Sequence, residues 1–257
     1  MGLNRLSRTG LAKKPFYVKS TGLNLWSVEE LCFFLSSNLP LIDSEIAGTR
    51  LTRWLTEEFR LTALALRMEK AAAADRSSLS GFLMPLFSDT GYFTAPMLKK
   101  LSASLKSLEA APAHVRYLKK ADALTDNRLF GEAMEYYRRA EETADPGDRA
   151  FLARTAHNRG VAAARMLEYD EAMKEFRKAL ELSGSREDLK TYLTALRITK
   201  PAEKYAAEAE EAGADDGLIR EIDEEIFRAM EKKFPLPDSP AEVIPHLREE
   251  FHRESGT

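Results

Sequence analysis

Apolar side chains recur three or four positions apart along most of the chain from residue 27 onward, which is the spacing of one helix face. The stretch Ser27–Glu30, SVEE, has the form of a capping box, so we expect a helix to begin there. Thr94, followed by alanine and proline, predicts a second helix start, and an amphipathic stripe of leucines follows it. These patterns predict an all-α fold.

Three stretches of the first half depart from simple helical periodicity. Residues 15–25, PFYVKSTGLNL, are the one segment that favours a short strand or an ordered arm. Residues 48–74 fit one bent helix or two short ones. In residues 79–93, LSGFLMPLFSDTGYF, one proline and two glycines interrupt the apolar pattern, so we expect only short helical turns there.

Two segments of the second half repeat the same order of small and large residues. FGEAMEYYRRA and YDEAMKEFRKA align on Ala133 and Ala172, and each has an aromatic residue four positions later. Another small residue, Ala121 or Gly160, lies twelve positions before each of these alanines. Small residues let two helices approach closely, and an aromatic ring fills the gap between them. The pattern therefore predicts two helical hairpins of the same design.

This arrangement resembles the tetratricopeptide repeat (TPR), a helix–turn–helix unit of 34 residues that stacks into a solenoid. The resemblance covers about residues 114–212. One repeat spans about 114–147 and a second about 153–186, and 187–212 is a degenerate third unit or a pair of capping helices. The alternative is an unrelated pair of helical hairpins.

Some positions depart from the pattern of this family. Arg159 stands where a buried leucine is usual, and Ala163 stands where an aromatic residue is usual. The central alanines are 39 residues apart, with a loop at Pro146 accounting for the excess over 34. In the third unit, Ala206 lies one 34-residue period after Ala172 and takes the place of the central alanine.

These observations predict three parts of the chain. We expect a helical N-terminal domain over residues 1–93 and an antiparallel helix-hairpin, TPR-like solenoid with capping helices over 94–234. A short C-terminal helix and a tail follow over 235–257. Residues 217–234 carry an apolar stripe with no proline, which is typical of a helix that covers the open end of a solenoid.

Composition and charge exclude several functional classes. The formal net charge is −3, with 14 basic and 10 acidic residues in 1–113 against 24 and 31 in 114–257, so neither part has the basic field of a nucleic-acid-binding protein. The longest apolar runs are far below the roughly 20 residues that span a membrane. We therefore expect a cytoplasmic protein that binds neither nucleic acid nor membrane.

The residues that usually carry catalysis or bind metals are not arranged for either task. The single cysteine, Cys32, lies in an apolar segment and is expected to be buried, and no two of the four histidines are four positions apart. The motifs GxSxG, HExxH, the P-loop and GxGxxG are absent. We expect no enzyme, no metal and no cofactor. Residues 203–225, with ten acidic and two basic residues, predict a solvated helix face or a docking surface for a basic partner.

The family resemblance implies a concave groove lined by the first helix of each repeat. The residues implied as groove-facing and peptide-binding are Lys119, Asp122, Arg154, His157, Asn158, Arg165 and Tyr192. An amide such as that of Asn158 can hold a peptide backbone, and basic side chains can hold carboxylates. The clamp for acidic C-terminal peptides known in this family is not expected here, because only Asn158 matches it.

The sequence therefore predicts a non-catalytic adaptor or assembly factor that binds a segment of a partner protein. Two alternatives remain open at this point. The protein is a homo-oligomeric scaffold, or it is an enzyme whose site lies in the N-terminal half. The groove hypothesis predicts that replacing Asn158 and Arg165 abolishes binding of the partner without a change in helix content.

Overall fold

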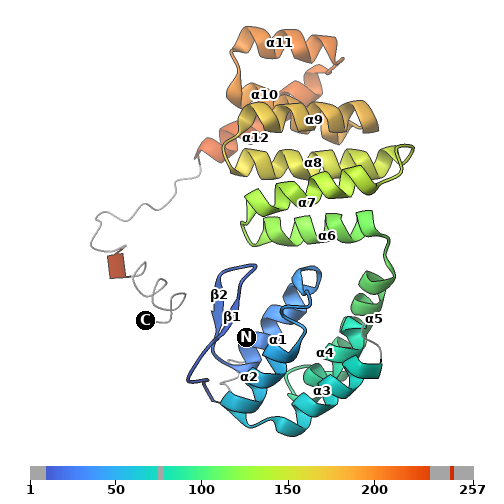
Figure 1. Cartoon of the computed structure of the whole chain (residues 1–257). Helices are drawn as coiled ribbons and strands as arrows, with labels where there is room; N and C mark the ends of the chain where they lie inside the picture. Colours follow the sequence, from blue (N-terminus) through green and yellow to red (C-terminus); the bar gives the residue numbers. More distant parts are fainter. Residues whose placement is uncertain (1–9, 75–77, 232–243, 246–257) are drawn as a thin grey trace. The chain divides into compact units, whose positions relative to one another are not determined.

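The computed structural model describes residues 10–74, 78–231 and 244–245. Its contacts divide the chain into two compact units, one containing residues 1–111 and the other residues 112–236. Twelve α-helices lie in the described residues, together with one two-stranded sheet (Figure 1). The all-α, helical-hairpin architecture expected from the sequence is therefore confirmed.

The first unit begins with a β-hairpin and a capped helix. Strands β1 (Phe16–Val18) and β2 (Leu23–Leu25) pair antiparallel, in the segment where a strand or an arm was expected. Helix α1 (Val28–Ser37) starts as the capping box predicts: the Ser27 hydroxyl accepts a hydrogen bond from the Glu30 backbone N–H, 3.1 Å away. This hydrogen bond gives a partner to a backbone amide that has none within the helix, and it fixes the start of the helix.

Residues 48–74 form two helices. Helix α2 (Thr49–Phe59) and helix α3 (Thr62–Ala74) are separated at Arg60, whose φ of 58° breaks the helical path. A short 3₁₀ helix (Leu39–Leu41) precedes them. The sequence left one bent helix or two short ones open, and the left-handed residue decides for two.

Residues 79–89 form one continuous helix, so the expectation of short turns was wrong. Helix α4 (Leu79–Asp89) runs through Pro85 and buries four large apolar side chains, Phe82, Leu83, Leu86 and Phe87. Their 1–4–5 spacing forms a single apolar face, and burying it outweighs the one backbone hydrogen bond that proline removes.

Helix α5 (Ala95–Ala110) starts after Thr94 with proline in its first turn, as expected. It belongs to the first unit, because Leu105 lies in the same core as the α1 and α4 side chains and the Glu109 carboxylate accepts a hydrogen bond from the Ser80 backbone N–H. The two units thus divide after residue 111, and not at the expected boundary between residues 93 and 94. The periodicity that predicted α5 does not say which core its leucines join.

The second unit is a stack of helical hairpins (Figure 1). The first hairpin consists of α6 (Ala113–Asp126) and α7 (Phe130–Thr143), and the second of α8 (Arg149–Arg165) and α9 (Tyr169–Ser183). Helices α10 (Arg186–Thr199) and α11 (Ala202–Glu211) form a third, and α12 (Asp216–Glu231) follows. Most of these helices pack on their neighbours in the chain, which is the arrangement of a solenoid.

The small and large residues of the repeat pack as their spacing predicts. Ala121, Ala133 and Ala172 are fully or almost fully buried. At Gly160 in α8, an added Cβ atom would lie 2.6 Å from two ring carbons of Phe176 in α9. That distance is far inside van der Waals contact, so only glycine allows α8 and α9 to approach this closely.

The turns inside the first two hairpins have the same geometry. Arg128 and Leu167, 39 positions apart, both adopt left-handed backbone angles, with φ of 61° and 64°. The amide of the following residue bonds to the carbonyl five positions earlier, from Leu129 to Leu124 and from Glu168 to Ala163. This is the Schellman end of a helix, which usually places glycine at the left-handed position. The repeat therefore extends to the turn.

The third hairpin has the expected helices but a different register of small and large residues. Ala206 is exposed, whereas Tyr205 and Ala209 are buried. Tyr205 is the fourth residue of α11, where α9 has Ala172, and Ala209 is the eighth, where α9 has Phe176. The large and small partners have exchanged places, and the alignment on Ala206 was wrong for this reason.

Helix α12 covers the third hairpin with only part of its apolar stripe. Leu218 and Ile222 are buried in the same core as Leu193 of α10, whereas Phe227 and Met230 are 62% and 80% exposed. The remainder of the expected C-terminal part, apart from residues 244–245, lies outside the described residues.

Candidate functional site

Two hollows of the second unit border helix α8, and we call the surface along α8 that includes both of them the inner face. The first hollow, of about 210 Å³, is bounded by α6, α7 and α8, and the second, of about 380 Å³, by α8, α9, α10 and α12. Helix α8 borders both, through Asn158 and Val161 in the first and Ala164 in the second. The two hollows thus lie beside each other along α8, the first helix of the second hairpin.

The first hollow contains two carboxylates and the amide of Asn158. The buried Tyr137 hydroxyl and the Asn158 Nδ2 amide both donate to Asp122 Oδ1, each over 2.9 Å. The Thr125 hydroxyl lies 3.2 Å from that of Tyr137, and Asp126 completes the acidic side. Burial raises the pKa of Tyr137, and the carboxylate of Asp122 adds to the shift, so the hydroxyl remains a donor at neutral pH.

The amide of Asn158 is thus already engaged within the protein. The sequence-based prediction gave it the role of holding a peptide backbone, and here its N–H group joins α8 to α6. Asn158 and Asp122 nevertheless line the same hollow.

The second hollow has an apolar floor and a polar rim. The floor is formed by side chains of α8, α9 and α10, namely Ala164, Tyr169, Ala172, Phe176, Ala195 and Ile198. Of these floor side chains, Tyr169 and Ile198 are 42% and 62% exposed. The rim residues are Glu187, Lys190, Thr191, Thr194, Thr199 and Glu225. Such a mixture of apolar floor and few polar groups is typical of a binding site.

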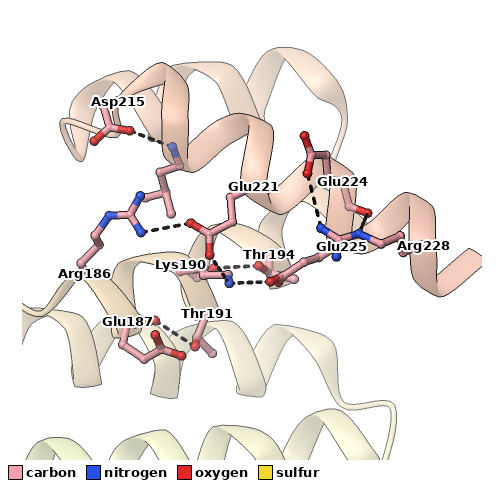
Figure 2. A network of polar contacts seen from close by, with 11 residues as sticks. Arg186, Glu187, Lys190, Thr191, Thr194, Asp215, Glu221, Glu224, Glu225 and Arg228 are labelled. Carbon is pink, nitrogen blue, oxygen red and sulfur yellow. Dashed lines mark hydrogen bonds and ion pairs between the residues drawn. The ribbon is translucent and has the colours of Figure 1, made fainter.

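A network of ion pairs holds α12 against the rim of the second hollow (Figure 2). Lys190 Nζ lies 2.7 Å from an oxygen of Glu221 and 2.7 Å from one of Glu225, and Arg186 pairs with Glu221 over 3.1 Å. The two carboxylates raise the pKa of Lys190 by accepting its hydrogen bonds. Part of the acidic run 203–225 therefore pairs with the preceding helices, a role that the sequence analysis did not foresee.

His157 joins α8 to α10 and does not line either hollow. Its Nδ1 atom lies 2.8 Å from Asp188 Oδ1, and Asp188 Oδ2 accepts hydrogen bonds from Ser183 and Ser185. Burial alone would raise the pKa of Asp188, but the bonds from the two serines and His157 outweigh it, and the pKa is lowered. Asp188 is therefore held ionised.

Tyr192 is buried, so its assignment to the groove was wrong. Its side chain is 5% exposed and packs in the core of the second unit, and its hydroxyl donates to Glu208 Oε2 over 2.8 Å. Burial first, and then the bond to Glu208, raise the pKa of Tyr192 to about 12. The third unit departs from the repeat, and its register therefore did not transfer.

The three basic residues of the predicted groove are exposed and line neither hollow. The Arg154 guanidinium lies over the ring of Phe151, 5.6 Å from its centroid. Lys119 lies on α6 and Arg165 in the last turn of α8, both outside the residues that bound the hollows. The structure thus brings Asp122 and Asn158 together and places the basic residues elsewhere.

Arg159, which departs from the repeat pattern, forms a polar cluster between the first two hairpins. Its guanidinium lies 3.3 Å from Glu175, 3.5 Å from Glu171 and 3.7 Å from Glu141. Glu175 is buried, and this burial raises its pKa despite the positive charge of Arg159. The arginine therefore replaces an apolar contact by an ionic one.

A hollow of about 340 Å³ lies next to α3 and α4 in the first unit. Two arginines and Asp89 line it, and Arg67 pairs with Asp89 at the surface. Cys32 is buried elsewhere in this unit, and burial raises the pKa of its thiol to about 12, so it is not a nucleophile at neutral pH. Within the described ranges, no group of three or more His, Cys, Asp or Glu residues could hold a metal ion.

The chain was compared with protein-family models and with curated proteins. No protein-family model matches the chain, and no curated protein matches it. Among the helices that the structure describes, none combines the length and the apolar character needed to cross a membrane.

Proposed function

We propose that this protein is a non-catalytic adaptor or assembly factor of the tetratricopeptide type, which binds a segment of a partner protein along the inner face. One observation carries the proposal: two hollows of about 210 and 380 Å³ border the same helix, α8, where an array of this kind binds its ligands. A bound segment can occupy both at once and bury more surface than either hollow offers alone.

The repeated packing supports the assignment to this type of repeat. The contact of Gly160 with Phe176 and the matching left-handed turns at Arg128 and Leu167 describe one helix hairpin used twice. The 39-residue interval is accommodated in the loop between α7 and α8, which contains Pro146 and Gly147.

Site-specific photo-crosslinking tests the proposal. A photoreactive amino acid is placed at Val161 in the first hollow, at Ala195 in the second, and at the exposed Ala207 of α11 as a matched control. In native cell extract, we expect the two inner positions to crosslink to the same protein and the control to leave it unlabelled. Equal labelling from Ala207, or none from the inner positions, refutes binding at this face.

A second candidate function is a homo-oligomeric scaffold. The observation that favours it is the exposure of Phe227 and Met230 on α12, at 62% and 80%. Light scattering across a concentration series tests it, because self-association through these residues raises the measured mass and is reduced by Phe227→Ser. A strict monomer at high concentration excludes it.

A further inference from the structure

No ion pair within the described residues neutralises the two carboxylates of the first hollow. Asp122 accepts hydrogen bonds from Tyr137 and Asn158, which are both uncharged donors. Within the described residues, neither Asp122 nor Asp126 forms an ion pair. The first hollow is therefore a partly enclosed acidic site with about 210 Å³ of space.

The second hollow is apolar at its floor and acidic at its rim. Glu187 and Glu225 line it together with one cation, Lys190, which is already shared between Glu225 and Glu221 (Figure 2). Phe176, Ala195 and Ile198 offer only apolar contact. A large aliphatic or aromatic side chain suits this floor, whereas an acidic residue there would meet two carboxylates of the same sign.

The arrangement of the hollows limits the spacing of the residues of a ligand that fills both. Val161 and Ala164, about one turn apart on α8, line the first and the second hollow respectively, so the two hollows adjoin each other along this helix. Side chains of an extended chain alternate between its two sides, so two residues that enter hollows on the same face are an even number of positions apart.

We propose that the inner face binds an extended segment of a partner protein that places a lysine or arginine in the first hollow and a large apolar residue, two or four positions away, in the second. This inference rests on the proposed function and names the chemistry of the partner. The charge of the hollows determines the basic residue, and the floor formed by Phe176, Ala195 and Ile198 determines the apolar one.

The probe for this proposal is a phage-displayed library of random dodecapeptides, selected on the immobilised full-length protein. Phage that also bind the variant Ala195→Leu, in which a larger side chain fills the second hollow, are removed. We expect the remaining sequences to be enriched in a basic and a large apolar residue two or four positions apart. Ala207→Leu, at an exposed position of α11, is the matched control and should retain the same phage.

Synthetic peptides of one selected sequence then separate the two contacts. We expect Asp126→Asn, at an exposed position, to weaken binding of the peptide about threefold to tenfold, as loss of a partly screened ion pair predicts. The same substitution should leave a peptide with its basic residue replaced by alanine unaffected. Glu132→Gln, an exposed acidic residue of α7, is the control for charge alone. Helix content and thermal unfolding of each variant confirm that it is folded.

The outcomes distinguish this inference from the proposed function. Selected peptides that are acidic or neutral and still lose binding in Ala195→Leu overturn the basic motif but leave the adaptor function intact. If no selected sequence depends on Ala195 for binding, both the basic motif and the proposed adaptor function are overturned. A protein that self-associates at this face, with loss of the dimer in Ala195→Leu, shows that a second copy is the occupant and also overturns the inference.

Discussion

Replacing Gly160 by alanine tests the packing on which the second hairpin depends. The new Cβ atom would lie 2.6 Å from two ring carbons of Phe176 and 3.2 Å from a third, whereas carbon atoms pack at about 3.5–4.0 Å. The ring is buried between helices, so it must move by about 1 Å or push α8 and α9 apart. Overpacking of this kind costs about 1–3 kcal/mol.

The substitution also has a favourable effect on the helix, which offsets part of the cost of overpacking. Alanine stabilises a helix interior relative to glycine by about 0.5–1 kcal/mol. We therefore expect Gly160→Ala to lower the free energy of unfolding by about 1–2 kcal/mol in total. The matched control is Gly131→Ala in α7, where no heavy atom lies within 4 Å of the added Cβ, and where we expect a gain of about 0.5 kcal/mol.

The assay is urea unfolding of the full chain followed by two signals. Both tryptophans, Trp26 and Trp54, lie in the first unit, so their fluorescence reports on that unit and should not change. The ellipticity at 222 nm follows the helices of both units and should shift to lower urea. Shortening the ring by Phe176→Leu should recover part of the loss in a double variant. If Gly160→Ala is as stable as Gly131→Ala, the close contact does not exist in solution.

Three further predictions follow from the polar clusters and the turns. Arg159→Leu should lower the free energy of unfolding by about 2–3 kcal/mol, because it leaves the buried Glu175 unpaired. Adding Glu175→Leu to this variant should recover most of the lost stability, and an Arg159→Leu variant as stable as the original chain contradicts the prediction. Because the pKa of Asp188 is lowered in the folded protein, its ionised carboxylate contributes to stability above the ordinary aspartate pKa of about 3.9, and this contribution is lost as the pH falls below that value. Asp188→Asn should therefore reduce the fall in melting temperature between pH 6 and pH 3, and an unchanged pH profile contradicts the prediction. Leu167→Gly should raise the free energy of unfolding by about 1 kcal/mol, because the backbone of this exposed leucine adopts the left-handed conformation that glycine prefers. Gly213→Ala, at an equivalent turn, should lower the free energy of unfolding by a similar amount. Thermal melts of both variants test this, and equal stabilities of the two contradict the turn geometry.

The helical repeat was predictable because its determinants are local and periodic. The alternation of Gly160, Ala172 and Phe176 encodes a close contact between two adjacent helices, and neighbours in sequence are neighbours in a hairpin stack. The capping box at Ser27 is likewise a contact over three residues. Such signals need no knowledge of distant segments.

Other features of the fold depend on context that the sequence pattern does not show. Arg128 and Leu167 occupy left-handed positions where glycine is usual, so no glycine marks these turns. Pro85 suggested a break, but the apolar face of α4 is buried on both sides of it. In each case tertiary packing overrides a local preference.

The candidate site was predictable only in part. Asp122 and Asn158 lie on the first helices of the two similar hairpins, where the sequence analysis placed its candidates, and both line the first hollow. The second hollow could not be foreseen, because Glu225 of α12 forms part of its rim and that helix lies outside the repeat. Tyr192 failed for the related reason that the third unit has exchanged its large and small residues.

The contact between the first and second hairpins includes polar groups beside apolar ones, and this affects how the first hollow can work. The ring of Phe151 in α8 contacts that of His114 in α6, and Met134 of α7 packs against the apolar core around Phe176 and Leu193. Arg159 and its carboxylate partners join the hairpins at one place, and the bond from Asn158 to Asp122 joins them at another. A basic side chain that enters the first hollow competes with Asn158 for the same carboxylate. If the proposed basic side chain binds in this hollow, its binding and the contact between the two hairpins are therefore coupled.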